Sequence, residues 1–230
     1  MKRITLTFDN GPHLDGTPHL LETLAARSLK ATFFVVGEKL RHAELRELAV
    51  RAKARGHRIA NHTHTHGVPL GRRPGKHVAE EEIGQAQQLL EGLAIEKLFR
   101  PNGDKGRLGE HMLSEDAVSY LEAHQFTAVS WNCVPQDWVM PPESWVERAQ
   151  KIMLKQDWTV LVVHDHCLDS MKYLGGFLDA LIAQGYEFSQ EFPVDCVLID
   201  RGRRTDALIG RYTPGAATSV SQPLASDAAY

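Results

Sequence analysis

Two short stretches of this 230-residue chain bring together side chains that could assist hydrolysis with a metal ion: residues 7–12, TFDNGP, and residues 61–66, NHTHTH. Histidines at positions i and i+4 lie on one face of a helical turn, so the spacing predicts that His62 and His66 hold one divalent ion. Asp9 ends an apolar run and supplies a carboxylate of the kind that such a site uses as a base. The structural alternatives are a turn carboxylate at a strand end and hydrogen-bonded histidines at a polar helix start.

The elements that must position these side chains alternate short apolar runs with longer amphipathic stretches, which is typical of βα units around a parallel sheet. Strands are predicted over residues 3–8, 31–36, 58–60, 97–100, 127–131 and 159–163, with a last strand pair over 186–189 and 196–199. Helices are predicted over residues 17–27, 43–55, 78–93, 114–123, 142–154 and 171–184. This count indicates an α/β fold with a closed or nearly closed barrel of about seven or eight units.

The length fits one domain, which we place over residues 1–200. From about residue 201 the alternation stops, and residues 213–230 are rich in Ala, Ser, Thr and Pro. Residues 201–230 are therefore predicted to form a flexible C-terminal tail.

Polar residues recur where the predicted strands end. Five of them lie at or beyond the C-terminal end of a strand: Asp9, His62, Arg100, Asp137 and His164. In βα barrels that end carries the active site, whereas the opposite end contributes to stability. We therefore expect these side chains to meet in one site.

Composition and charge exclude several classes of protein. The net charge of −3 leaves no basic surplus to neutralise phosphates, which argues against a nucleic-acid partner. No stretch approaches the ~18 apolar residues of a membrane span, and residues 4–8 already read as a strand rather than a signal peptide.

Cys133, Cys167 and Cys196 show no paired spacing, which suits reduced thiols. We expect a soluble cytoplasmic protein; a homo-oligomer stays open.

Three more segments extend the pattern of the first two: residues 99–103, FRPNG; residues 136–138, QDW; and residues 161–165, LVVHD. In this order the five segments resemble the motifs of the polysaccharide deacetylases, carbohydrate esterase family four with its NodB-like homology domain. The resemblance covers roughly residues 3 to 190. It implies a distorted (β/α) barrel of about seven strands that hydrolyses N-acyl amides of a small-molecule or oligosaccharide substrate through one divalent metal ion, most often zinc.

The resemblance also assigns roles to residues. It implies that Asp9 is the catalytic base, with Arg100 holding its carboxylate ionised, and that His164 is the acid, with Asp137 as its partner. The backbone N–H of Asn102 would stabilise the oxyanion.

The metal ligands implied by the resemblance are His62, His66 and Asn10, and Trp138 would wall a small pocket that favours acetyl or formyl groups. Asn10 stands where the family has a metal-binding aspartate. An amide oxygen brings no charge, so either the ion is held more weakly or the site works without metal. Asn102 stands where the family has an aromatic residue.

Three functions are compatible with these residues. The first is a metal-dependent deacetylase of an amino sugar or a related small intracellular compound. The second is a metal-independent hydrolase of a cyclic amide, as in the allantoinase-like branch of the superfamily, which Asn10 favours and the intact His62 and His66 oppose. The third is a catalytically silent barrel that binds a saccharide, which the presence of Asp9 and His164 opposes.

Overall fold

Strand β1 (Arg3–Gly11) is the strand around which the sheet is built in this computed structural model, which describes residues 2–212. Its side chains alternate between two faces, as the pleat of a strand requires. Ile4, Leu6 and Phe8 enter a large apolar core beneath the helices. Thr5, Thr7 and Asp9, which are also buried, point to the other face. The alternation therefore delivers Asp9 to the inside of the curled sheet.

The sheet has nine strands in the order β6-β1-β2-β3-β4-β5-β8-β9, and β7 pairs with the first residues of β1. The seven strands β1 to β7 are parallel, and β8 and β9 are antiparallel. The remaining strand bounds are β2 (Thr32–Val35), β3 (Arg58–Asn61), β4 (Leu98–Phe99), β5 (Thr127–Val129), β6 (Trp158–His164), β7 (Glu187–Ser189), β8 (Val197–Asp200) and β9 (Arg203–Arg204).

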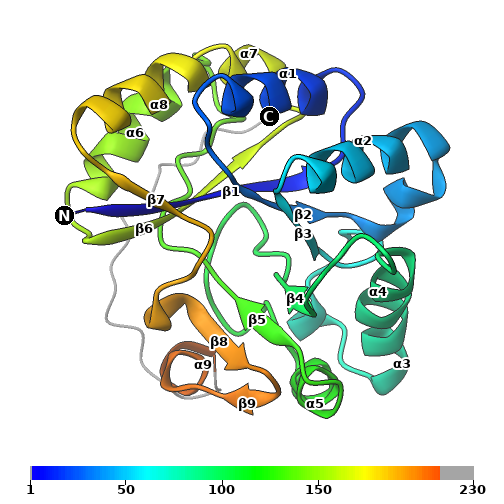
Figure 1. Ribbon diagram of the computed structural model, residues 1–230. Helices are drawn as coiled ribbons and strands as arrows, with labels where there is room; N and C mark the ends of the chain where they lie inside the picture. The colour runs from blue at the N-terminus through cyan, green and yellow to red at the C-terminus, as the bar shows by residue number, and fades with distance from the viewer. Residues whose placement is uncertain (1, 213–230) are drawn as a thin grey trace.

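Helices surround this curled sheet, and β8, β9 and α9 lie together at one side of the molecule (Figure 1). The α-helices are α1 (Gly16–Ala25), α2 (Ala43–Ala54), α3 (Lys76–Ala79), α4 (Gln85–Leu89), α5 (Glu115–Ala123), α6 (Ser144–Met153), α7 (Leu168–Met171), α8 (Leu174–Ala183) and α9 (Asp206–Tyr212). Short 3₁₀ turns occupy Gly37–Arg41, Leu70–Arg72 and Val194–Cys196, and a π-helical turn, η3, occupies Glu80–Gly84. Within residues 2–212, no helix is long and apolar enough to cross a membrane.

The expected distorted α/β barrel of about seven strands is confirmed, because seven parallel strands curl around one interior. The curl is incomplete. The segment that follows β5 meets β6 at an isolated parallel bridge between Cys133 and Leu161.

Three expectations from the sequence differ from the structure. The last two predicted strands do not pair with each other: β7 pairs with β1, and β8 pairs with β5 and β9. The predicted helix over residues 78–93 is split by the π-helical turn η3. The predicted flexible tail over residues 201–230 begins with regular structure, β9 and α9, and residues 213–230 lie outside the described residues.

A close approach of backbones holds α1 against the end of β6. Gly16 begins α1, and a Cβ atom added there would lie 1.7 Å from the backbone oxygen of Asp165. We expect Gly16→Ala to lower the free energy of unfolding by about 3 kcal/mol, because backbone atoms must move to relieve the overlap.

Gly176 in α8 is the matched control, because a Cβ atom added there would meet nothing within 4 Å. Gly176→Ala should raise the free energy of unfolding by roughly 0.5–1 kcal/mol, since alanine loses less backbone entropy than glycine in a helix. Urea denaturation of the two variants beside the wild type measures both changes. Equal stability of the Gly16→Ala variant and the wild type would contradict the packing described here.

Candidate active site

A buried ion pair between Asp9 and Arg100 lies at the centre of the curled sheet. Arg100 follows β4 and is fully buried, and its Nη1 donates to Oδ1 of Asp9 at 2.8 Å. The same nitrogen donates to the hydroxyl oxygen of Thr7 at 2.7 Å, and Nη2 donates to the carbonyl oxygen of Ser130 at 3.3 Å. The guanidinium also lies 3.9 Å from the centre of the Phe34 ring. These contacts fix the guanidinium, and with it the Asp9 carboxylate.

The charges around Asp9 keep its carboxylate ionised. Burial by itself would raise the pKa of Asp9, but the positive charge of Arg100, followed by His62 and His164, outweighs burial, so the pKa is lowered from 3.8. Asp9 is therefore a carboxylate at neutral pH, in a place where water has little access. A buried, ionised carboxylate of this kind can accept a proton.

His62 and His66 come together, although not in the way that their spacing suggested. They lie in a turn after β3 rather than on a helix, with positive φ angles of 66° at Thr63 and 52° at His66. The ring centres are 4.8 Å apart. The helical interpretation of the i and i+4 spacing was wrong, but the pairing of the two rings that it predicted is present.

Glu82 holds this turn in place from 18 residues further along the chain. Its Oε2 accepts hydrogen bonds from the backbone N–H groups of His64 and Thr65, and its Oε1 accepts one from the Thr65 hydroxyl. Glu82 is buried and belongs to the π-helical turn η3, a feature that often occurs at functional sites. Sequence reasoning missed Glu82, because no local pattern connects it with the histidines.

Asn10 reaches the same pocket as Asp9 because β1 is irregular at this point. Neighbouring residues of a regular strand face opposite ways. The pairing of β1 with β2 shifts register between Asp9 and Gly11, and Asn10 has a φ of 69°. Such a bulge redirects a side chain. Both Asp9 and Asn10 consequently line one pocket.

Three observations fit a metal ion held by His62, His66 and Asn10. The Oδ1 atom of Asn10 is buried without a hydrogen-bond partner in the described chain. His62 Nδ1 lies 2.9 Å from the carbonyl oxygen of Arg100, which can only accept, so this nitrogen carries the hydrogen and Nε2 keeps a lone pair. That Nε2 lies 3.5 Å from Oδ2 of Asp9.

The protonation states of the two histidines agree with this fit. Burial lowers the pKa of His62 below its ordinary value, more than the Asp9 charge raises it. Burial, together with the charge of His62, lowers the pKa of His66 to about 3. Both rings are therefore neutral at pH 7, as metal ligation requires. The donor set of two imidazoles and one amide oxygen fits a divalent ion such as zinc.

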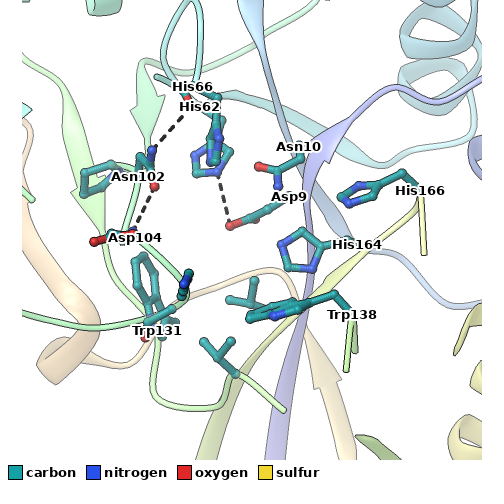
Figure 2. Close-up of a pocket in the computed structure, with 16 residues that line it drawn as sticks. Asp9, Asn10, His62, His66, Asn102, Asp104, Trp131, Trp138, His164 and His166 are labelled. Atoms are coloured by element: carbon teal, nitrogen blue, oxygen red, sulfur yellow. Dashed lines mark hydrogen bonds and ion pairs between the residues drawn. The ribbon is translucent and has the colours of Figure 1, made fainter. Parts of the chain in front are cut away.

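His164, at the end of β6, lies across Asp9 from His62 (Figure 2). Its position follows from pairing, because β6 runs beside β1 with His164 in register with Asp9. Nδ1 of His164 lies 2.8 Å from Oδ1 of Asp137, and the His164 backbone N–H donates to Oδ2 at 2.7 Å. Burial opposes charge on the ring, but the Asp137 carboxylate outweighs it and raises the pKa of His164. His164 is thus suited to donate a proton.

Within residues 2–212, Asp137, His164 and Cys167 also place possible ligand atoms within 4.8 Å of one another. Two facts argue that this group works as a hydrogen-bonded cluster. Both carboxylate oxygens of Asp137 already accept hydrogen bonds from His164. Burial and the nearby Asp137 charge raise the pKa of the Cys167 thiol to about 12, which disfavours the thiolate that a metal would need.

The pocket itself has a volume of about 180 Å³ and is lined by aromatic and polar side chains. Trp138 forms part of the wall, with its ring in a T-shaped contact with that of His164 at a centre distance of 5.2 Å, and is 39% exposed. Trp131 forms another part and is buried, and a Cβ atom on Gly103 would lie 2.3 Å from its ring. Sequence reasoning missed Trp131 as a lining residue, and it assigned no role to His166, which also lines the pocket.

Asn102 connects two loops of the site through its side chain. Its Nδ2 donates to the carbonyl oxygen of Gly67 at 2.7 Å, and its Oδ1 accepts from the backbone N–H of Asp104 at 2.9 Å. Asn102 lines the pocket beside Pro101. The structure therefore brings all the residues expected from the sequence into one region: seven line the pocket, and Arg100 and Asp137 support Asp9 and His164 from behind.

Comparison with known proteins identifies the class to which this fold and site belong. The family model described as polysaccharide deacetylase matches residues 1–129. The chain therefore belongs to the polysaccharide deacetylase family.

Similar proteins include a chitooligosaccharide deacetylase of Rhizobium leguminosarum bv. phaseoli, 33% identical over 165 residues, which are 70% of this chain and 67% of that one. A peptidoglycan-N-acetylglucosamine deacetylase of Bacillus cereus is 30% identical over 192 residues, which are 81% of this chain and 85% of that one. The crystal structure of a polysaccharide deacetylase from Bacillus cereus matches with a TM-score of 0.67 and 27% identity, over 84% of this chain and 93% of that chain.

The effect of Asp137 on the pKa of His164 can be tested without an assay of enzymatic activity. In an Asp137→Asn variant the pKa of His164 should fall, because burial remains while the carboxylate that stabilises the imidazolium is gone. Titration of the histidine ring signals by NMR measures the change. Asp169→Asn is the control, since Asp169 is exposed on α7 and pairs with Lys172; it should leave His164 unchanged. A His164 pKa that stays raised in Asp137→Asn would contradict this account.

Proposed function

We propose that this protein is a metal-dependent deacetylase that hydrolyses the N-acetyl or N-formyl amide of an amino sugar or a short oligosaccharide. The observation that carries the proposal is the placement of a base and an acid around one pocket. Asp9 is ionised beside Arg100, and His164, whose pKa is raised by Asp137, lies in register with it on the next strand. Membership of the polysaccharide deacetylase family supports the same reaction.

The metal ion would be held by His62, His66 and Asn10. When bound, it would polarise the acyl carbonyl and lower the pKa of a water molecule. Asn10 contributes no charge, so we expect weaker binding than an aspartate would give. The orphaned Oδ1 of Asn10 is the feature of the chain that supports this ligand set.

The two titratable groups divide the proton transfers between them. Asp9 accepts the proton of the attacking water, because its pKa is lowered and its carboxylate is fixed by Arg100. His164 then donates a proton to the departing amine nitrogen, with Asp137 stabilising the imidazolium before transfer. The net reaction adds one water across the amide bond and releases a carboxylic acid and an amine.

The remaining lining residues would position the substrate. The backbone N–H of Asn102 stabilises the negative charge that develops on the acyl oxygen. Trp138 closes one wall next to His164 and excludes water from the acyl group. A pocket of about 180 Å³ suits a small acyl group such as acetyl or formyl.

The substrate class is taken from the relatives, which are named as deacetylases of chitooligosaccharide and of peptidoglycan N-acetylglucosamine. An intracellular substrate and a cytoplasmic location stay predictions from the sequence. Cell fractionation with an antibody against the protein tests the location directly.

Metal content tests the proposal first. The purified protein should carry close to one equivalent of zinc or another divalent ion, and chelation should abolish hydrolysis of N-acetylated and N-formylated amino sugars until the ion is returned. His66→Ala should lower the metal content, whereas His64→Ala, in the same turn but outside the pocket lining, should not. Asn10→Asp should bind the ion about tenfold more tightly or better, since it adds a charged ligand.

Two outcomes would replace the proposal with one of its rivals. A metal-free protein that still opens a cyclic amide would favour the metal-independent hydrolase. A protein inert toward every amide, with and without added metal, would favour the silent saccharide-binding barrel.

The pH profile provides a separate test of the assigned base and acid. Protonation of Asp9 should reduce activity only at a pH below 3.8, since the pKa of Asp9 is lowered from that value. On the alkaline side, activity should fall at a pH above 6.5, because the pKa of His164 is raised from that value and the ring loses its proton only at higher pH. Asp9→Asn should reduce kcat by about 10²–10⁴-fold. An alkaline limb that does not move to lower pH in Asp137→Asn would show that His164 is not the acid.

A further inference from the structure

The charges that line the pocket are balanced with one exception. Two carboxylates line it, and both are paired: Asp9 with Arg100, and Asp104 with Arg72 and Arg107 at 2.9 and 3.0 Å. Lys105 also lines the pocket and is exposed, and no hydrogen bond or ion pair joins its side chain to any described residue. Its ammonium is therefore a charge at the pocket that the protein itself leaves unpaired.

The backbone that carries Lys105 is held in an uncommon conformation. Asp104, Lys105 and Gly106 have consecutive positive φ angles of 43°, 63° and 78°. Non-glycine residues adopt such angles at a cost and keep them only where the surroundings enforce them. Strained backbone of this kind clusters at functional sites.

Contacts on both sides of Lys105 enforce this conformation. On one side, the Asn102 side chain accepts a hydrogen bond from the Asp104 backbone N–H and donates one to the carbonyl oxygen of Gly67, next to the turn that carries His62 and His66. On the other side, the Gly106 carbonyl oxygen accepts from Nε1 of Trp131 at 3.0 Å, and a Cβ atom on Gly106 would lie 2.6 Å from Val134. Lys105 is thus presented at the pocket by a fixed loop, whereas its side chain stays available.

The local charge differs in sign from that of the whole protein. The chain carries a net charge of −3. On this loop, however, Asp104 pairs with two cations, Arg72 and Arg107, and the neighbouring Lys105 adds a third. Three cations with one carboxylate leave this loop, which lines the pocket through Asp104 and Lys105, with a local positive charge that attracts anions.

We propose that Lys105 binds an anionic group, a phosphate or a carboxylate, that the substrate carries close to its N-acylated sugar. This proposal rests on the proposed function and narrows it, from neutral amino sugars to acidic ones. The ammonium of Lys105 makes a charge-assisted hydrogen bond to the anionic oxygen, while the acyl group enters the pocket toward Asp9 and His164. Arg72 and Arg107, held by Asp104, add to the positive potential.

The experiment compares three probes on the metal-loaded protein: N-acetylglucosamine, its 6-phosphate, and N-acetylmuramic acid, which carries a carboxylate. We expect the KM of one or both anionic probes to be about tenfold lower than that of the neutral sugar, with a similar kcat. The preference should shrink at high salt, because the lysine is exposed. The phosphate and carboxylate arms distinguish the two sources of the charge.

Three variants assign the effect to this lysine. Lys105→Gln should remove the preference by raising the KM of the anionic probe about tenfold, with the neutral sugar unaffected. Lys105→Arg should retain most of it. Lys155→Gln is the matched control, because Lys155 is exposed just beyond α6 and does not line the pocket; it should behave as the wild type.

Failure of this inference can be distinguished from failure of the proposed function. Hydrolysis of all three probes with equal KM, unchanged by Lys105→Gln, would overturn the inference and leave the deacetylase in place. If no probe is hydrolysed, calorimetric binding of the same probes decides. Tighter binding of an anionic probe, lost in Lys105→Gln, would support the anion site, and equal or undetectable binding of all three would overturn it.

Discussion

The buried pair of Asp9 and Arg100 is the interaction on which the rest of the site depends. A guanidinium that is fully buried is tolerated only when its charge is compensated, and removal of one partner of such a pair costs about 3–5 kcal/mol. Asp9 supplies the compensation, while Thr7, Ser130 and the Phe34 ring fix the orientation of the guanidinium. The carbonyl oxygen of Arg100 also accepts from Nδ1 of His62. Arg100, which follows the short strand β4, therefore sets both the ionisation of Asp9, the proposed base, and the tautomer of His62, a proposed metal ligand.

An asparagine at position 10, in place of an aspartate, removes a negative charge from the site and leaves the backbone shape as it is. The bulge in β1 that brings Asn10 beside Asp9 is a property of the backbone and would serve an aspartate equally well. With an amide there, the proposed ligand set of Asn10, His62 and His66 is neutral, and Oδ2 of Asp9 lies 3.5 Å from Nε2 of His62. A bound divalent ion would keep more of its charge than it would beside an aspartate ligand. Such an ion would polarise an acyl oxygen more strongly, but the protein would hold it less tightly.

The sequence predicted the parts of the site that follow from strand geometry. Asp9 and His164 lie near or at the C-terminal ends of two parallel strands, and such ends meet at one edge of the sheet, so their proximity could be inferred from position alone. The turn that carries His62 and His66 could not be predicted, because positive φ angles and the buried Glu82 of the π-helical turn determine it rather than a local repeat. The hydrogen bond from Asn102 to Gly67 and the placement of Trp131 in the pocket wall depend on contacts between loops that lie far apart in the sequence. Motifs identified these loops, but only packing shows what each side chain touches.

The two sides of the pocket are built for different tasks. Asp9, His62 and His164 are fixed by buried hydrogen bonds on the strand ends, which is the rigidity that proton transfer and metal binding need. The loop from Pro101 to Gly106 also has a fixed backbone, yet its outermost side chain, Lys105, is exposed and unpaired. Chemistry at the strand ends can stay constant while a side chain on the loop determines which substrate is bound. The charge of this loop, rather than the acyl pocket, is thus the feature of this chain that would separate its substrate from a neutral oligosaccharide.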